Sequence, residues 1–267
     1  MADNIFNDRC NIRNVCFIFF KIGQQGKVYI QKDKGALSYE GIKSYCRNGF
    51  DNRNSLDSFC EQVAPSDCKL KVGKELFTVF GPSLVKDLTQ KGFDVFLDLK
   101  FHDIPNTVSR AVKAACDIGV WMTNVHSLGG SKMMEEANKA RLACGSKTNL
   151  IAVTMLTSHK SSELIEIGIN ESISCQVEKL AAMTFRSGLD GVVCSARECA
   201  GLREKFGKDF KLVTPGIRLS DDPRNDQSRV ATPEVAIKSG SNYLVIGRPI
   251  TQSEDPASKL REINGLI

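Results

Sequence analysis

Two short runs of the sequence place charged residues at alternating positions among apolar ones. Asp98 and Lys100 alternate with leucines, and Asp103 follows three residues after Lys100. Lys71 stands in the same way between two apolar residues. Because alternate side chains of a β-strand share one face, the charged residues of each run lie opposite to the apolar ones. A lysine ammonium held between carboxylates stays charged, so such a face can stabilise a negative charge that develops on carbon and then protonate that carbon.

These charges occupy positions where a parallel strand of a barrel is normally apolar. A network of structural ion pairs would explain one such residue, but burying several charges is costly unless they meet partners. We therefore predict that four charged residues, Lys71, Asp98, Lys100 and Asp103, form one catalytic array. His102 lies between Lys100 and Asp103, and we interpret it as structural.

Two further apolar runs end in a glycine and an arginine, which is typical of a phosphate site. Gly216 and Arg218 end one of these runs, and Gly247 and Arg248 end the other. Glycine leaves backbone N–H groups accessible, and the arginine fork forms charge-assisted bonds to phosphate. The segment from Arg218 to Gln227 is polar and contains a proline, which indicates a loop that closes over the phosphate.

Short apolar runs alternate with segments whose apolar residues are spaced by three and four, a pattern typical of parallel strands joined by helices. We expect strands at 70–73, 95–99, 121–126, 150–155, 191–195, 211–214 and 243–246, and helices that include 76–91, 107–118 and 175–187. The α/β order and the length of 267 residues predict a (β/α)₈ TIM barrel. An open doubly wound sheet is the alternative, but it would carry a GxGxxG turn after its first strand, which this sequence lacks.

The first strand of the barrel is atypical or missing. It should precede a helix that we expect to begin near Asn54, but residues 45–50 (YCRNGF) are partly polar and contain a glycine. Residues 16–19 or 28–30 could supply a strand, although each leaves a linker that is long for a compact barrel. We therefore divide the chain into an N-terminal segment of unknown role, residues 1–50, and a barrel domain, residues 51–267.

Four ordered motifs carry a resemblance to a known family. The string DLKFHDIPNT at 98–107, with KVGK at 71–74 upstream and VTPGIR at 213–218 and IGRP at 246–249 downstream, resembles the orotidine 5′-phosphate decarboxylases of the bacterial type. The resemblance implies decarboxylation of orotidine 5′-phosphate to UMP without a cofactor. The reaction would pass through a carbanion at C6 of the pyrimidine, and Lys100 would stabilise and protonate that carbon.

The resemblance also implies a homodimer with shared active sites. Lys71, Asp98, Lys100 and Asp103 would form an alternating Lys-Asp-Lys-Asp array, in which Asp103 reaches into the active site of the other subunit. Thr107 would contact the ribose bound by that neighbouring subunit.

Further substrate contacts follow from the same resemblance. Thr157 would read the edge of the pyrimidine, although a helix N-cap explains this threonine equally well. Arg248 and Gln227 would bind the 5′-phosphate, with Arg218 at the base of the loop and Gly247 beside them. The sequence departs from the family at Gly49, which stands where the family has an aspartate that contacts the ribose.

Two other functions fit part of this pattern. One is a sister barrel that decarboxylates or synthesises sugar phosphates with Mg²⁺, but that family has an acidic residue where this chain has Lys71, and a cation there opposes a metal ion. The other is a pseudoenzyme that binds a phosphate ligand and is disabled by its altered N-terminus.

Composition excludes several classes of partner. The net charge of +5 is spread along the chain, without the basic tract expected of a nucleic-acid-binding protein. The chain has 10 cysteines without a CxxC pair and only 3 histidines, which favours reduced thiols and argues against a metal site or a disulfide framework. Because we find no convincing signal peptide or membrane segment, we expect a cytoplasmic protein.

Overall fold

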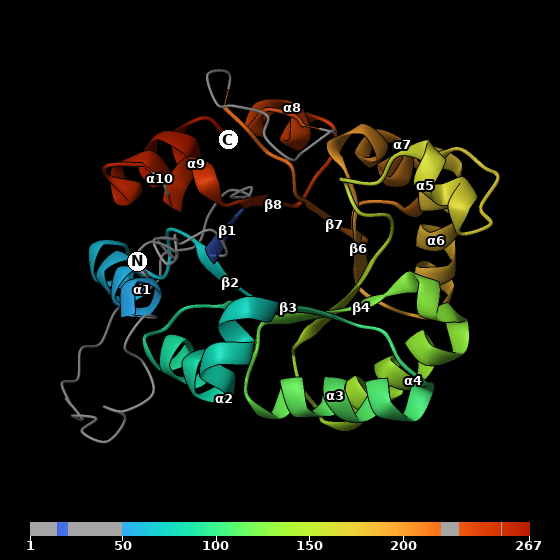
Figure 1. Cartoon of the computed structure of the whole chain (residues 1–267), viewed down its shortest axis with the longest axis horizontal. Coiled ribbons are helices and arrows are strands. Elements are labelled where there is room, and N and C mark those ends of the chain that lie inside the picture. The colour runs from blue at the N-terminus through green and yellow to red at the C-terminus, as the bar shows by residue number, and fades with distance from the viewer. Residues whose placement is uncertain (1–14, 21–49, 220–229, 252) are drawn as a thin grey trace, which may run out of the picture.

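Eight strands in the described residues close a barrel, and helices surround it (Figure 1). This computed structural model describes residues 15–20, 50–219, 230–251 and 253–267. The strands are β1 (Val15–Phe20), β2 (Lys69–Gly73), β3 (Val95–Phe101), β4 (Met122–His126), β5 (Asn149–Val153), β6 (Gly191–Val193), β7 (Lys211–Thr214) and β8 (Tyr243–Ile246).

The helices follow the strands in the order expected of a (β/α)₈ barrel. They are α1 (Phe50–Gln62), α2 (Lys74–Gln90), α3 (Pro105–Asp117), α4 (Gly130–Ala143), α5 (Ser161–Glu166), α6 (Ile173–Arg186), α7 (Ala196–Phe206), α8 (Pro233–Lys238), α9 (Arg248–Thr251) and α10 (Pro256–Gly265), with a 3₁₀ turn η1 (Ser127–Gly129) before α4. In the part of the chain that the structure covers, none of these helices is long and apolar enough to cross a membrane.

Strands β2 to β8 pair with one another in chain order, and each pair is parallel. This arrangement confirms the predicted α/β barrel, and β7 and β8 have the bounds expected from the sequence. In a barrel of this kind the carboxyl ends of all parallel strands meet on one face, where barrel enzymes keep their reacting groups. The fold therefore brings the residues at the ends of β2, β3, β5, β7 and β8 to one face.

The first strand differs from the other seven in direction. β1 pairs antiparallel with both β2 and β8, and it contains the run at 16–19 that the sequence offered as one of two candidates. Residues before position 51 therefore contribute a strand to the barrel. Backbone groups pair in either direction, so a reversed strand closes the ring. Gly49 and residues 45–49 lie outside the described residues.

Reversal of β1 changes which face its ends approach. Val15 at its start lies beside Val72 near the carboxyl end of β2, and Phe20 at its end lies beside Tyr243 at the start of β8. The carboxyl end of β1 therefore opens on the face opposite the ends of the other strands.

The two faces of each strand are divided as the alternation of the sequence predicts. Inside the barrel an apolar layer is formed by Phe96, Met122, Ile151 and Val213, which come from four different strands. Leu97 is buried with the residues that pack between the barrel and its helices. Side chains that alternate with Phe96 along β3 consequently project above this inner layer, toward the carboxyl face.

Removal of β1 tests whether this reversed strand supports the barrel. We predict that a chain lacking residues 1–20 melts at least about 5 °C lower than the full chain and aggregates more readily, because β2 and β8 become open edges. A chain lacking residues 1–13 keeps β1 and is the matched control. Equal melting temperatures for the two truncated chains, measured by circular dichroism, would show that β1 is dispensable.

Candidate active site

A buried carboxylate between two ammonium groups lies at the carboxyl end of β2 and β3. Asp98 Oδ2 is 2.9 Å from Lys71 Nζ, and Asp98 Oδ1 is 2.6 Å from Lys100 Nζ. Lys71 and Asp98 are only 8% and 9% exposed. Three members of the predicted array, Lys71, Asp98 and Lys100, therefore lie in contact. This is expected of residues that share the inner face of adjacent strands.

The charge of Asp98 is set by two opposing effects. Burial by itself would raise its pKa, but the nearby ammonium groups of Lys71 and Lys100 and hydrogen bonds from Lys100 and Asn124 outweigh burial and hold the pKa well below its ordinary value. Asp98 is therefore ionised throughout the physiological pH range. Its negative charge is what allows two ammonium groups to lie in one small volume.

Asn124 completes the contacts of the carboxylate. Its Nδ2 donates a hydrogen bond of 2.7 Å to Asp98 Oδ1, and its Oδ1 accepts one of 2.8 Å from the backbone N–H of Lys100. Asn124 lies on β4 and is fully buried. This residue was not predicted from the sequence, although an asparagine inside an apolar strand is a signal that could have found it.

A cavity of about 270 Å³ opens above these groups. Lys71, Asp98 and Lys100 line one side of it, and Thr157 lines it from the loop after β5. Apolar residues cover the remaining walls, and they are Phe96, Val153, Met155, Leu156, Val193, Cys194, Val213, Pro215 and Val245, with Ser158 beside Thr157. The cavity thus combines a charged wall, an apolar wall and a hydroxyl group, as a site for a planar polar ring requires.

The predicted phosphate residues lie at the ends of the neighbouring strands. Arg218, which is buried, follows β7 and donates through Nη1 to the Ile217 carbonyl at 2.7 Å. Gly247 follows β8 directly, and Arg248 begins α9. The cavity is lined by Pro215, directly after β7, and by Val245 of β8, but not by these three residues. Gln227 lies outside the described residues.

Asp103 and Thr107 lie outside the cavity of their own chain. Both side chains are exposed, and Asp103 Oδ1 accepts a hydrogen bond of 2.6 Å from the backbone N–H of Ile104. Thr107 lies in the first turn of α3. Within this chain the fourth member of the predicted array is therefore separate from the other three.

Comparison with known proteins agrees with this geometry. Residues 49–263 match the family described as Orotidine 5′-phosphate decarboxylase / HUMPS. The chain belongs to this family. Two relatives named orotidine 5′-phosphate decarboxylase, from Escherichia fergusonii and Escherichia coli O9:H4 (strain HS), are each 54% identical over 219 residues, which cover 82% of this chain and 89% of the relative.

Solved structures of similar proteins have the same fold. The crystal structure of orotidine 5′-phosphate decarboxylase from Lactobacillus acidophilus matches with a TM-score of 0.72 and 41% identity, covering 80% of this chain and 93% of the other. An uncharacterised conserved protein from Geobacillus kaustophilus matches with a TM-score of 0.65 and 39% identity, covering 73% and 86% of the two chains. The matched region of this family member begins after β1.

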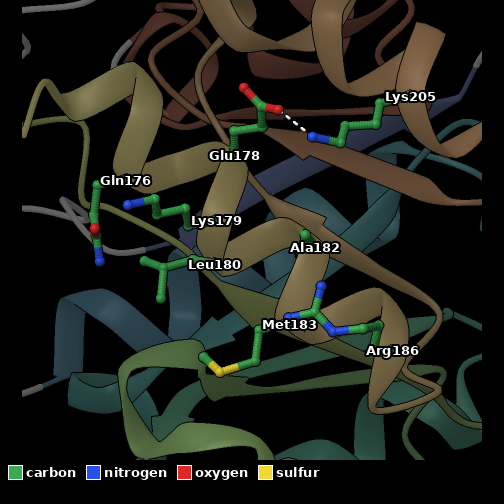
Figure 2. Close-up of a pocket in the computed structure, with 8 residues that line it drawn as sticks. All are labelled: Gln176, Glu178, Lys179, Leu180, Ala182, Met183, Arg186 and Lys205. Carbon is green, nitrogen blue, oxygen red and sulfur yellow. Dashed lines mark hydrogen bonds and ion pairs between the residues drawn. The ribbon is translucent and has the colours of Figure 1, made fainter.

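A separate hollow of about 440 Å³ lies on the outer surface of α6 (Figure 2). Its lining residues come from α6 and the end of α7, and they are Gln176, Glu178, Lys179, Leu180, Ala182, Met183, Arg186 and Lys205. Figure 2 shows the ion pair between Glu178 and Lys205. The hollow contains no residue from the carboxyl ends of the strands.

The histidines near the site do not form a metal centre. The rings of His102 and His126 stack with centroids 5.5 Å apart, and His126 Nδ1 accepts a hydrogen bond of 3.3 Å from the backbone N–H of Leu128. Among the described residues, no three His, Cys, Asp or Glu side chains are grouped so that they could hold a metal ion.

The half-buried position of His126 makes stability depend on pH. Burial, together with the smaller effects of the charges of His102, His159 and Lys100, lowers the pKa of His126 from 6.5 to about 4. Between the ordinary pKa of 6.5 and a pKa of about 4, the unfolded chain therefore binds a proton that the folded chain does not. Folding stability contributed by neutral His126 is complete above that window and is lost as the pH falls through it.

We predict that His126→Asn flattens this dependence while keeping an acceptor for the Leu128 N–H. The melting temperature of the unmodified protein should fall more between pH 7 and about pH 4.5 than that of the variant, because only the unmodified protein retains the titrating ring. Thermal melts at a series of pH values provide the measurement. Parallel curves for the two proteins would contradict the assigned protonation.

Proposed function

We propose that this chain decarboxylates orotidine 5′-phosphate to UMP with the residues that line the barrel cavity. The observation that carries the proposal is the contact of one buried carboxylate, Asp98, with the ammonium groups of Lys71 and Lys100 beside an open cavity. Membership of the family and 54% identity to named decarboxylases support the same reaction.

The reaction needs a cation at the carbon that loses CO₂. When the C6–carboxylate bond breaks, its electron pair remains on C6 as a carbanion in the plane of the ring. We assign the Lys100 ammonium to this carbon, where it stabilises the developing charge and then transfers a proton to C6. Lys71 contacts one carboxylate oxygen of Asp98, and Lys100 contacts the other. The two lysines therefore share the negative charge of Asp98.

The same contacts support a reaction without a metal ion. Both oxygens of Asp98 already contact ammonium groups, at 2.9 and 2.6 Å. A divalent cation would meet two positive charges here and would have to compete with them for the carboxylate. The chemistry that a cofactor would supply in other decarboxylases is supplied in this proposal by the position of Lys100.

Binding of the substrate is divided along the carboxyl face. We assign Thr157 to the pyrimidine edge, because it lines the same cavity as the charged residues. Arg248, Gly247, Arg218 and Gln227 are assigned to the 5′-phosphate. Phosphate binding after the last two strands is common in barrels of this kind, and the ends of β7 and β8 adjoin the cavity through Pro215 and Val245.

We propose that Asp103 and Thr107 act in the site of a second copy of the chain. Both are exposed and lie beside Ile104, a large apolar residue that is 65% exposed, while Leu128 after β4 is 37% exposed. Apolar side chains exposed around a functional edge are typical of an interface. In a symmetric dimer the same residues would serve both sites.

A reducing compartment fits the cysteines. The seven cysteines whose side chains the structure describes are all free thiols. Disulfides are rare in the cytoplasm, where thiols are kept reduced. We therefore propose a cytoplasmic enzyme.

Separate roles for Lys100 and Arg248 can be tested by kinetics. We predict that Lys100→Ala lowers kcat for orotidine 5′-phosphate by about 10⁴-fold or more, because charge stabilisation and proton transfer are lost together. Arg248→Ala should instead raise KM about tenfold to a hundredfold through loss of a charged phosphate contact. Lys139→Ala, on the exposed face of α4, is the control. The loss of substrate absorbance in the ultraviolet is the measurement, and a kcat for Lys100→Ala within about tenfold of the unmodified enzyme would refute its assignment.

The shared site can be tested by mixing inactive chains. Lys100→Ala and Asp103→Ala homodimers should both be inactive, but a heterodimer places both changes in one site and leaves the other intact. We predict that activity returns after subunits exchange, up to about one quarter of the unmodified level at equal mixing, because half of the dimers carry one intact site. Exchange is monitored independently by native mass spectrometry. Exchange without recovered activity would show that Asp103 acts in its own chain or not at all.

A further inference from the structure

The pairing of β3 with β4 contains an irregularity at the reacting residues. Leu97 pairs with Thr123, and the next pair in register is Phe101 with Val125. Three residues of β3 therefore lie opposite a single residue of β4, which is Asn124. A bulge of this kind interrupts the backbone ladder, so groups that the ladder would have paired need other partners.

The last residue of this bulge has an unusual backbone conformation. Lys100 has a φ of 53°, and it is the one residue other than glycine with a positive φ in the part of the chain that the structure describes. The left-handed region is costly for a residue with a long side chain, so surrounding contacts must hold the backbone there. The conformation determines where the Lys100 side chain leaves the strand.

Asn124 holds both ends of the bulge with one amide group. Its Oδ1 accepts from the backbone N–H of Lys100 at 2.8 Å, and its Nδ2 donates to Asp98 Oδ1 at 2.7 Å. These partners fix the orientation of the amide. The backbone N–H of Lys100 needs an acceptor, which is Oδ1, and the carboxylate of Asp98 needs a donor, which is Nδ2. Asn124 is fully buried, so water cannot readily replace either bond.

We propose that Asn124 is a positioning residue for the decarboxylation. It holds the backbone of Lys100 in the left-handed conformation and holds Asp98 in the orientation that directs the Lys100 ammonium toward the reacting carbon. This inference rests on the proposed function and extends it to a residue that contacts the two charged groups from the neighbouring strand. The asparagine amide makes both contacts because it carries a donor, Nδ2, and an acceptor, Oδ1, on the same carbon.

The neighbouring residue offers a matched control. Thr123 is also fully buried on β4, and its hydroxyl donates to the Leu97 carbonyl of β3 at 3.1 Å. Thr123→Val removes a buried bond between the same two strands while nearly conserving volume. It does not touch Asp98 or Lys100, because consecutive residues of a strand point to opposite faces.

The experiment compares Asn124→Ala, Asn124→Asp and Thr123→Val with the unmodified enzyme. We expect kcat for orotidine 5′-phosphate to fall at least about 100-fold in both Asn124 variants, because a small displacement of a reacting group is sufficient for such a loss. Asn124→Asp conserves the size of the side chain but replaces the donor to Asp98 by a carboxylate, so a loss there is not a packing effect. KM for the substrate and the Kd for UMP, measured by calorimetry, should change less than about threefold, since the phosphate contacts are intact.

Melting temperatures separate positioning from folding. Thr123→Val should be destabilised yet keep its kcat within about threefold of the unmodified enzyme. If Asn124→Ala does not fold, Asn124→Ser is measured in its place. The inference is overturned if the folded Asn124 variants keep kcat within about threefold, or if kcat and affinity fall together in proportion to stability in all variants. An unmodified enzyme without decarboxylase activity would instead refute the proposed function itself.

Discussion

A single buried carboxylate that must satisfy two ammonium groups imposes the geometry on which the rest of the site depends. Placing charges in a protein interior costs several kcal/mol for each ion unless partners are close and well oriented. Asp98 meets this condition with Lys71 at 2.9 Å, Lys100 at 2.6 Å and the amide of Asn124 at 2.7 Å. These contacts therefore fix the positions of β2, β3 and β4 relative to one another at their carboxyl ends. The bulge in β3 and the left-handed backbone of Lys100 are local costs of maintaining that relation.

The remainder of the barrel makes this arrangement effective. The apolar layer of Phe96, Met122, Ile151 and Val213 is buried, and Phe96 and Val213 line the cavity together with the charged residues. In such surroundings a charge interacts more strongly with a developing carbanion than it would in water. The strands that close the ring support this layer, and the direction of β1 matters less than its presence, because its backbone pairs with both β2 and β8.

The period of two along the strands explains what the sequence could predict. Alternation correctly assigned Lys71, Asp98 and Lys100 to one face, and seven strands and their order followed from the spacing of apolar runs. The direction of β1 could not be predicted, because an apolar run of six residues is compatible with either orientation. Asn124 was also missed: an asparagine inside an apolar strand is unusual, but the bulge that places it opposite Asp98 and Lys100 leaves no mark in the alternation. Asp103 was predicted with the array but lies outside the cavity within one chain, where its Oδ1 accepts a hydrogen bond from the backbone N–H of Ile104.

We propose that the negative charge of Asp98, rather than the shape of its side chain, organises the reacting lysine. Asp98→Asn conserves the shape and removes the charge, and its kcat for orotidine 5′-phosphate can be measured after circular dichroism has shown that the variant is folded. If the shared carboxylate holds Lys100 at the reacting carbon, kcat falls by about 10³-fold or more. A folded Asp98→Asn enzyme with kcat within about tenfold of the unmodified protein would contradict this account.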